Sequence, residues 1–285
     1  MEEHVVGADD QALQYMLTEA QWDSQAVMDQ VAQEVNQLLG GDGSCLLLDE
    51  SGVEKKGEHS VGVARQWNGR LGKVDNCQVG VFAALGRGAR ATLIDYRLYL
   101  PESWSEDAPR CQKLGIPEAC RAFKTKSEPA LEMVRYQRQQ GIKFAWVGAD
   151  GGYGKEPAFL RELDDMDEIF VVDVHKDQLI YLEDPQPIIP QKKSNQRGRK
   201  TSRYQAQTQP VRVDHWKEAL PETAWQRYKL RDCTKGELIV EIVHRRVWLW
   251  DKNEAHAHHW HLLARRELNS PETCKYTPHG HLCGK

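Results

Sequence analysis

Two short apolar runs that each end in an aspartate constrain this chain more than any other feature of its sequence. The run SCLLL at residues 44–48 leads to Asp49, and the run at residues 143–149 leads to Asp150. Short apolar runs of this kind are typical of strands that are buried on both faces. We therefore expect two buried strands, each of which ends at a carboxylate and is followed by a loop; after Asp49 this loop covers residues 50–58.

The segments around these runs predict a mixed sheet. Residues 24–39 carry apolar side chains at helical spacing, with Asp23 or Ser24 as N-cap and Gly40-Gly41 as the stop. Further helices are expected at 127–140, with Ser127 as N-cap, and near 156–165. Strands are expected at 59–67, 76–85, 91–100, 143–149 and 168–174. An antiparallel meander followed by alternating strands and helices predicts the α/β class, a mixed sheet with helices on both faces.

The second half of the chain has strand-like segments without the alternating helices of the first half, and this pattern predicts a β-rich insertion. Strand-like segments occur at 225–231, 237–250 and 258–266, and the turn at 251–254 makes the last two a hairpin. The tail has no hydrophobic periodicity, so we expect no regular structure there. The expected organisation is a helical segment at 1–43, a core at 44–174, an insertion with a basic linker at 175–269 and an aberrant tail at 270–285.

Composition excludes some classes of protein. The formal net charge is -4, so the whole chain is not an obvious binder of polyanions. No run approaches the roughly 18 to 20 apolar residues that span a bilayer. Seven cysteines form no CxxC pair, which favours reduced thiols. These features predict a cytoplasmic protein that does not enter a membrane.

Local charge gives a different indication from the net charge. The segment QKKSNQRGRKTSR at 191–203 contains six cations and no acid, and such a run can neutralise phosphates, although a solvated linker explains it equally well. Four cations near the loops after Asp49 are also candidate phosphate contacts, with ordinary solvent exposure as the alternative. The candidate DNA-binding residues are Lys55, Lys56, Arg65, Lys73, Lys192, Lys193, Arg197, Arg199, Lys200 and Arg203.

Asp49 and Asp150 are the candidate catalytic and metal-binding residues. Carboxylates brought together at one rim of a sheet repel each other unless they share a hard cation, and oxygen ligands suit Mg²⁺ or Mn²⁺. The alternative for either residue is an ordinary turn or helix N-cap. The glycines of GGYG after Asp150 lack the Lys-Ser/Thr ending of a phosphate-binding loop, which excludes a nucleotide site of that type. The histidines at 256–261 favour a polar hairpin face over a zinc site.

Four long strings carry a family resemblance. The strings are LLLDESGVEKKGEHSVGVARQWNGRLGKVDNCQVGVFAAL, RLYLPESWSEDAPRCQKLGIPE, VGADGGYG and LRDCTKGELIVEIVHRRVWLWD. They resemble insertion-sequence transposases of the DDE superfamily, a bacterial group, and the resemblance extends over about residues 7–276. The resemblance implies a ribonuclease H-like core with a β-rich insertion, a divalent metal, and hydrolysis followed by strand transfer. It makes Asp49 the first catalytic acid and Asp150 the second. The implied partners are double-stranded DNA, as transposon end and target, and a homo-oligomer of the chain, with nucleoid association when DNA is bound.

The third acid of the family has no counterpart in this sequence. The family places a catalytic Glu on a helix after the insertion, within a stretch resembling R-Y-W-x-E-x-x-F, and nothing like it follows residue 276. From this we expect a truncated transposase whose activity is impaired or lost. The alternative is a non-catalytic DNA-binding fragment that occupies transposon ends or inhibits the full-length transposase.

Overall fold

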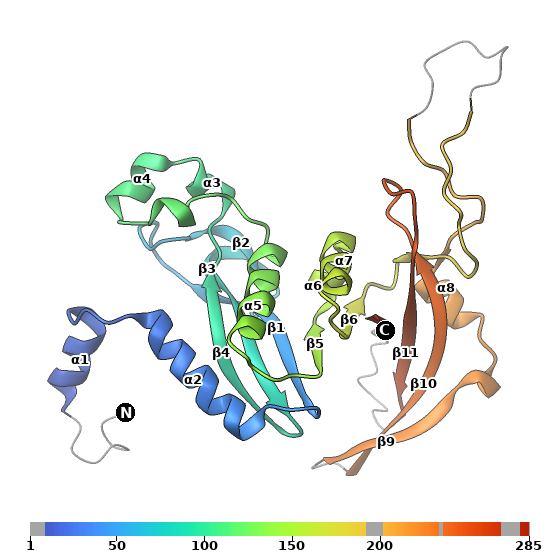
Figure 1. Ribbon diagram of the computed structural model, residues 1–285, viewed down its shortest axis with the longest axis horizontal. Coiled ribbons are helices and arrows are strands. Elements are labelled where there is room, and N and C mark those ends of the chain that lie inside the picture. The colour runs from blue at the N-terminus through green and yellow to red at the C-terminus, as the bar shows by residue number, and fades with distance from the viewer. Residues whose placement is uncertain (1–8, 192–201, 234–235, 269–279, 285) are drawn as a thin grey trace.

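The structure, a computed structural model, describes residues 9–191, 202–233, 236–268 and 280–284 (Figure 1). Its strands are β1 (Ser44–Glu54), β2 (Ala64–Asn68), β3 (Lys73–Arg87), β4 (Arg90–Leu98), β5 (Trp146–Ala149), β6 (Phe170–Val174), β7 (Leu179–Ile180), β8 (Val211–Arg212), β9 (Gln226–Cys233), β10 (Gly236–Leu249), β11 (His258–Glu267) and β12 (Gly280–Gly284). Its α-helices are α1 (Asp10–Thr18), α2 (Ser24–Leu39), α3 (Glu102–Ser105), α4 (Ala108–Lys113), α5 (Ser127–Gln139), α6 (Gly151–Gly154), α7 (Pro157–Asp165) and α8 (Val213–Glu218). None of the described helices combines the length and the apolar character needed to cross a lipid bilayer.

The core of the sheet has the strand order β4-β3-β1-β5-β6. β3 is antiparallel to both β1 and β4, whereas β1, β5 and β6 are parallel to one another. This mixed sheet with flanking helices confirms the expected α/β class and is consistent with a ribonuclease H-like fold.

The expected meander of four successive strands is wrong in one respect. β3 pairs along one edge with β1, and along its other edge first with β2 and then with β4. β3 is 15 residues long, against 5 and 9 residues for β2 and β4, so its second edge has room for both short strands. β1 therefore does not pair with β2, and its free edge is available to β5.

Helix α2 shows why its segment folds as expected. The Asp23 side chain accepts hydrogen bonds from the backbone N–H groups of Gln25 and Ala26, which satisfies donors at the helix start. The buried face of α2 is formed by Ala32, Val35 and Leu39. The expected cap of α5 is wrong, because that helix already includes Ser127 and its N-cap position is Lys126, which makes no side-chain cap bond.

The helices cover one face of the core strands, whereas the sequence predicted helices on both faces. Leu46 and Leu48 of β1 are buried in the same cluster as side chains of α2, α5 and α7. Successive strand residues point to opposite faces. Leu47 of β1 and Tyr96 of β4 point the other way and are 37% and 45% exposed. Among the described residues this second face of β1 and β4 is open, and it is the face that carries Asp49.

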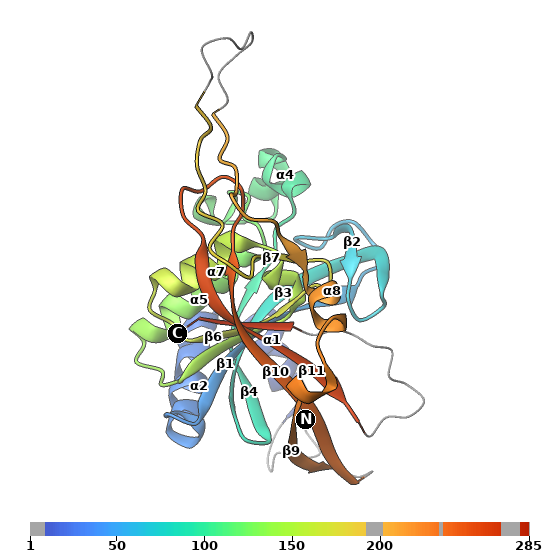
Figure 2. The same cartoon turned by 90° about the vertical axis from the view of Figure 1, so that its right-hand side faces the viewer.

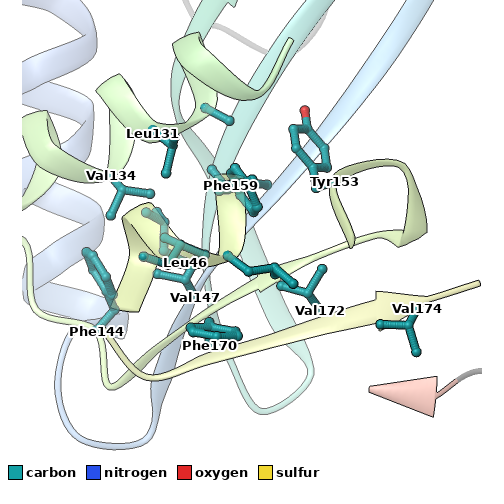
Figure 3. Packing of buried hydrophobic residues seen from close by; sticks show 14 of the residues in the cluster. Leu46, Leu131, Val134, Phe144, Val147, Tyr153, Phe159, Phe170, Val172 and Val174 are labelled. Atoms are coloured by element: carbon teal, nitrogen blue, oxygen red, sulfur yellow. The ribbon is translucent and has the colours of Figure 1, made fainter. Parts of the chain in front are cut away.

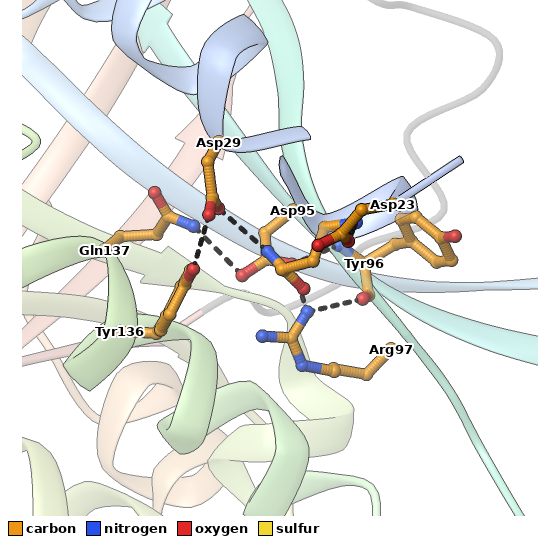
Figure 4. A network of polar contacts seen from close by, with 8 residues as sticks. Asp23, Asp29, Asp95, Tyr96, Arg97, Tyr136 and Gln137 are labelled. Atoms are coloured by element: carbon orange, nitrogen blue, oxygen red, sulfur yellow. Dashed lines mark hydrogen bonds and ion pairs between the residues drawn. The ribbon is translucent and has the colours of Figure 1, made fainter. Parts of the chain in front are cut away.

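A polar network fixes α5 against α2 and β4 (Figure 4). The Tyr136 hydroxyl donates to Asp29 Oδ2 at 2.7 Å, and Gln137 Nε2 donates to Asp95 Oδ2 at 2.9 Å. Asp95 is 1% exposed and forms an ion pair with Arg97. The hydrogen bond to Asp29 raises the pKa of Tyr136. Buried polar groups need such partners, so the network fixes the C-terminal part of α5, which contains Tyr136 and Gln137, against α2 and β4.

The β-rich insertion lies at the far end of the same sheet, and Figure 2 views the molecule from this end. β10 and β11 form the expected hairpin, in which Leu249 pairs with His258, and β9 pairs with β10. The expectation for the tail is wrong for Gly280–Gly284, because these residues form β12. β12 pairs with β6 on one side and β11 on the other, and so satisfies the backbone groups of two strand edges. The rest of the tail up to residue 279, and residue 285, lie outside the described residues.

The apolar core extends under the short helix that follows β5 (Figure 3). Val147, Phe159 and Phe170 are at most 1% exposed. Gly154 ends this helix directly against β6, and a Cβ atom built on it would lie 1.9 Å from the Asp173 carbonyl oxygen. The last glycine of GGYG is therefore required by a close approach of two backbones.

We expect Gly154→Ala to destabilise the protein by about 1–3 kcal/mol or more, because the methyl group forces α6 away from β6. Gly151→Ala is the matched control, since its Cβ would find its nearest neighbour, a His175 ring atom, at 3.5 Å. Urea unfolding followed by circular dichroism measures both variants. Equal stability of the two variants would contradict the close approach.

Candidate active site

The register of two parallel strands brings Asp49 and Asp150 together. Leu48 of β1 pairs with Ala149 of β5, so the next residues along the two strands, Asp49 and Asp150, are neighbours. Adjacent strands lie about 4.8 Å apart, and paired residues project to the same face. Asp49 lies within β1 and Asp150 directly follows β5, the parallel neighbour of β1, so the two residues are adjacent in the fold. That their carboxylates share one cation remains a prediction.

One detail of the expected site is wrong. β1 does not end at Asp49 but continues to Glu54, because its pairing with β3 persists from Asp49 opposite Phe82 to Glu54 opposite Cys77. The parallel partner β5 does end, at Ala149. Asp49 therefore lies in the middle of a strand, at the point where that strand loses its second neighbour. Of the residues expected to form a loop after Asp49, residues 50–54 extend the strand instead, and the loop begins at residue 55.

Backbone N–H groups orient both carboxylates. Asp49 Oδ1 accepts from the N–H of Glu50 at 2.7 Å, and Asp150 Oδ1 accepts from the N–H of Gly152 at 2.9 Å. Asp150 is thus the N-cap of α6, as the alternative interpretation proposed, and lies beside Asp49 as well. Among the described residues neither carboxylate forms an ion pair. Burial raises the pKa of Asp49, and the charge of Asp150 raises it further.

Two further acids near this pair were missed in the sequence analysis. Glu50 forms an ion pair with Lys126 at 2.7 Å, and Glu156 accepts a hydrogen bond from the Ser127 hydroxyl. Lys126 and Ser127 are the N-cap and first residue of α5. No local motif indicates these pairs, since their partners lie 76 and 29 residues apart in the chain. The start of α5 therefore supplies a partner to each of these two glutamates. Asp49 and Asp150 have no cationic side chain as a partner among the described residues.

The donor set at Asp49 and Asp150 fits a hard divalent cation. Mg²⁺ commonly takes one or two carboxylates from a protein and completes its octahedron with waters and substrate phosphates. Within the part of the chain that the structure describes, no group of three His, Cys, Asp or Glu side chains is placed to hold one ion. The two aspartates would hold the cation, and the remaining ligands would come from elsewhere.

The histidines of the insertion form the polar hairpin face that the sequence favoured. His259 stacks on Trp248, with ring centroids 4.2 Å apart, and His261 Nδ1 lies 2.6 Å from His244 Nε2. His258 projects to the opposite face and stacks on the buried Trp260.

Of the candidate DNA-binding residues, Lys55, Lys56, Arg65, Lys73 and Arg203 lie among the described residues. Lys55 follows the end of β1 six residues beyond Asp49, which corresponds to roughly 20 Å along an extended strand. Lys56 and Arg65 are exposed in the same region. Lys73 is paired with Asp75 at 2.7 Å, a contact that raises the pKa of Lys73. Arg203 is exposed, and Lys192, Lys193, Arg197, Arg199 and Lys200 lie outside the described residues.

On this mixed, ribonuclease H-like sheet, Asp49 of β1 and Asp150, directly after β5, form a pair of neighbouring carboxylates, a donor set of the kind that binds a divalent cation. Comparison with known proteins gives the family. The profile of the DDE superfamily endonucleases matches residues 1–237, and the chain belongs to this family. Over 181 residues it is 29% identical to a protein of Microchaete diplosiphon described as "Probable transposase for insertion sequence element IS701". That alignment covers 62% of this chain and 44% of the relative, so the chain matches less than half of the relative's length.

We expect Asp49→Asn to stabilise the protein at pH 7 in the absence of divalent cations. Because the pKa of Asp49 is higher in the folded chain than its ordinary value of 3.8, ionisation of Asp49 opposes folding. This loss of folding stability is complete at pH values above the pKa of Asp49 in the folded chain, and it disappears at pH values below the ordinary pKa of 3.8. Since the carboxylate is only partly buried and solvent screens its charge, we expect a gain below about 1 kcal/mol.

Urea unfolding in EDTA at pH 7 and near pH 3 measures this difference, which should vanish at the lower pH. Asp75→Asn is the control, and it should lower the stability at pH 7. The hydrogen bond from Lys73 lowers the pKa of Asp75, so the ionised Asp75 stabilises the folded state at neutral pH. A loss of stability in Asp49→Asn at pH 7 would show that Asp49 is compensated by a group outside the described residues.

Proposed function

We propose that this chain carries the catalytic core of an insertion-sequence transposase, in which Asp49 and Asp150 bind Mg²⁺ or Mn²⁺ and the substrate is transposon-end DNA. The observation that supports it most is the pairing of Leu48 with Ala149, which makes the two aspartates neighbours on one face of the sheet. Family membership supports DNA as the partner and a divalent cation as the cofactor.

The residues of the chain have distinct roles in this proposal. Asp49 and Asp150 would hold the cation, which would activate the attacking oxygen and stabilise the leaving oxygen in phosphodiester cleavage. The N–H groups of Glu50 and Gly152 hold the two carboxylates in fixed orientations before the cation binds. Lys126 holds Glu50 in an ion pair and so keeps a third negative charge compensated beside the site. The open face around Asp49 leaves room for DNA to approach.

We further propose that cleavage by this chain is slow. Two carboxylates leave the cation to be completed by other ligands, and small misplacement in a reacting site costs roughly a hundredfold in rate. The absence of a group of three ligating side chains among the described residues supports this. The same absence favours a second candidate function, in which the chain binds transposon ends without cutting them.

We expect the wild-type chain to bind Mn²⁺ and duplex DNA, and to cleave that DNA at a rate at least about a hundredfold below that of a transposase with three acids. Asp49→Asn and Asp150→Asn should abolish Mn²⁺ binding. Electron paramagnetic resonance of free Mn²⁺ measures binding, and a gel assay on transposon-end DNA measures cleavage.

Glu132→Gln provides the matched control, because Glu132 is a surface acid whose partner is Lys124, and this variant should bind Mn²⁺ like wild type. Cleavage that requires both aspartates would support the enzyme, whereas DNA binding without cleavage would support the second candidate. Normal Mn²⁺ binding by both aspartate variants would rule out the proposed site.

The basic segment is the proposed contact with the DNA backbone. Replacing Lys192, Lys193, Arg197, Arg199 and Lys200 by Gln should weaken duplex binding and reduce the slope of log K against log salt by up to about 4–5, near 0.9 for each phosphate that is no longer neutralised. Fluorescence anisotropy across a salt series measures both quantities. The double variant Arg90→Gln, Lys113→Gln, at two exposed cations outside the candidate set, separates this effect from a change in net charge. Unchanged affinity and slope in the five-residue variant would identify the segment as a linker.

A further inference from the structure

Tyr153 is a buried phenol whose hydroxyl has no hydrogen-bond partner among the described residues. The residue is 4% exposed, and its ring packs against Phe159 with centroids 5.1 Å apart. In Figure 3 the hydroxyl points away from the packed apolar side chains. An unpaired buried hydroxyl costs free energy, because it loses its hydrogen bonds to water without gaining others. A phenylalanine would fill the same space without that cost, so the hydroxyl needs an explanation outside the packing of the core.

The surroundings of the hydroxyl are acidic. Burial raises the pKa of Tyr153 far above its usual value, and the charges of four carboxylates raise it further; they belong to Glu50, Asp150, Asp49 and Glu156, in decreasing order of effect. The phenol is therefore protonated at any physiological pH and is a permanent hydrogen-bond donor. A donor surrounded by acceptors is placed to orient one of them.

The other residues around the hydroxyl narrow the choice of acceptor. Glu50 is already bound by Lys126, and Glu156 already accepts from Ser127. Asp150 uses Oδ1 for the N–H of Gly152. Asp150 is the N-cap of α6 and Tyr153 is the third residue of that helix, so both belong to a single turn. Asp150 and Glu156 each lie three residues from Tyr153 in the sequence, and Asp150 is the one whose described hydrogen bond comes from the backbone and not from another side chain.

We propose that Tyr153 is a positioning residue, whose buried hydroxyl orients the Asp150 carboxylate for the divalent cation that Asp150 shares with Asp49. The inference rests on the proposed function, since it assumes that the cation binds there. Removal of a group that donates a hydrogen bond to a metal-binding side chain typically lowers the metal affinity by 10- to 100-fold. In this role the unpaired hydroxyl lowers the stability of the cation-free protein and gains its partner when the cation binds.

Tyr153→Phe in the full chain tests the inference with two measurements. We expect Mn²⁺ affinity, followed by electron paramagnetic resonance without DNA, to fall about tenfold or more. We expect the melting temperature in EDTA to stay the same or rise, because the variant removes an unpaired buried hydroxyl. A merely structural hydroxyl would give the opposite pair of results, a lower melting temperature and unchanged affinity.

Tyr136→Phe is the matched control. Its hydroxyl donates to Asp29 at 2.7 Å in the network between α2 and α5, so its loss should lower the melting temperature and leave Mn²⁺ affinity unchanged. Wild-type affinity in Tyr153→Phe, with binding lost in Asp49→Asn and Asp150→Asn, would overturn the role of Tyr153 alone. Wild-type affinity in all three variants would overturn the metal site, and the role of Tyr153 with it.

Discussion

The parallel pairing of β1 with β5 is the interaction on which the rest of the site depends. It joins an antiparallel unit, β4-β3-β1, to a parallel one, β1-β5-β6, and its register sets Asp49 beside Asp150. A slip by one residue would send the side chains of β5 to the opposite face. The burial of Leu46 and Val147 on the helix-covered face prevents this slip, because both residues are fully buried there. The apolar core thus specifies the geometry of two charged residues that it does not contain.

Charge compensation around the site is uneven, and this unevenness has a physical meaning. Glu50 and Glu156 are bound from α5, while among the described residues Asp49 and Asp150 accept hydrogen bonds from backbone N–H groups alone. Two adjacent carboxylates without a counter-ion cost stability, as the raised pKa of Asp49 indicates. Such a cost is common where a protein reserves a position for a ligand. Tyr153 adds an unpaired donor to the same region, so both features have one explanation in a bound cation.

Much of the fold could be predicted from the sequence, because the relevant signals are local. The capped periodicity of α2, the apolar runs of β1 and β5, and the hairpin of β10 and β11 each specify an element within one short segment. The predictions failed where distant segments compete for an edge or a face. β3 takes two partners on one edge, β1 extends past Asp49 because β3 remains beside it, and β12 forms between two strands that are far apart in the chain.

The sequence by itself determined which residues are the candidates for the chemistry, since an aspartate that follows a short apolar run is visible in one segment. It also determined the family, through motifs that are long enough to be specific. Only the tertiary structure decided that Asp49 and Asp150 are neighbours, that Lys126 and Ser127 bind the acids next to them, and that the hydroxyl of Tyr153 is buried without a partner among the described residues. These facts depend on strand register and helix packing, which are set by contacts between residues up to about a hundred positions apart. Local sequence patterns contain no record of such contacts.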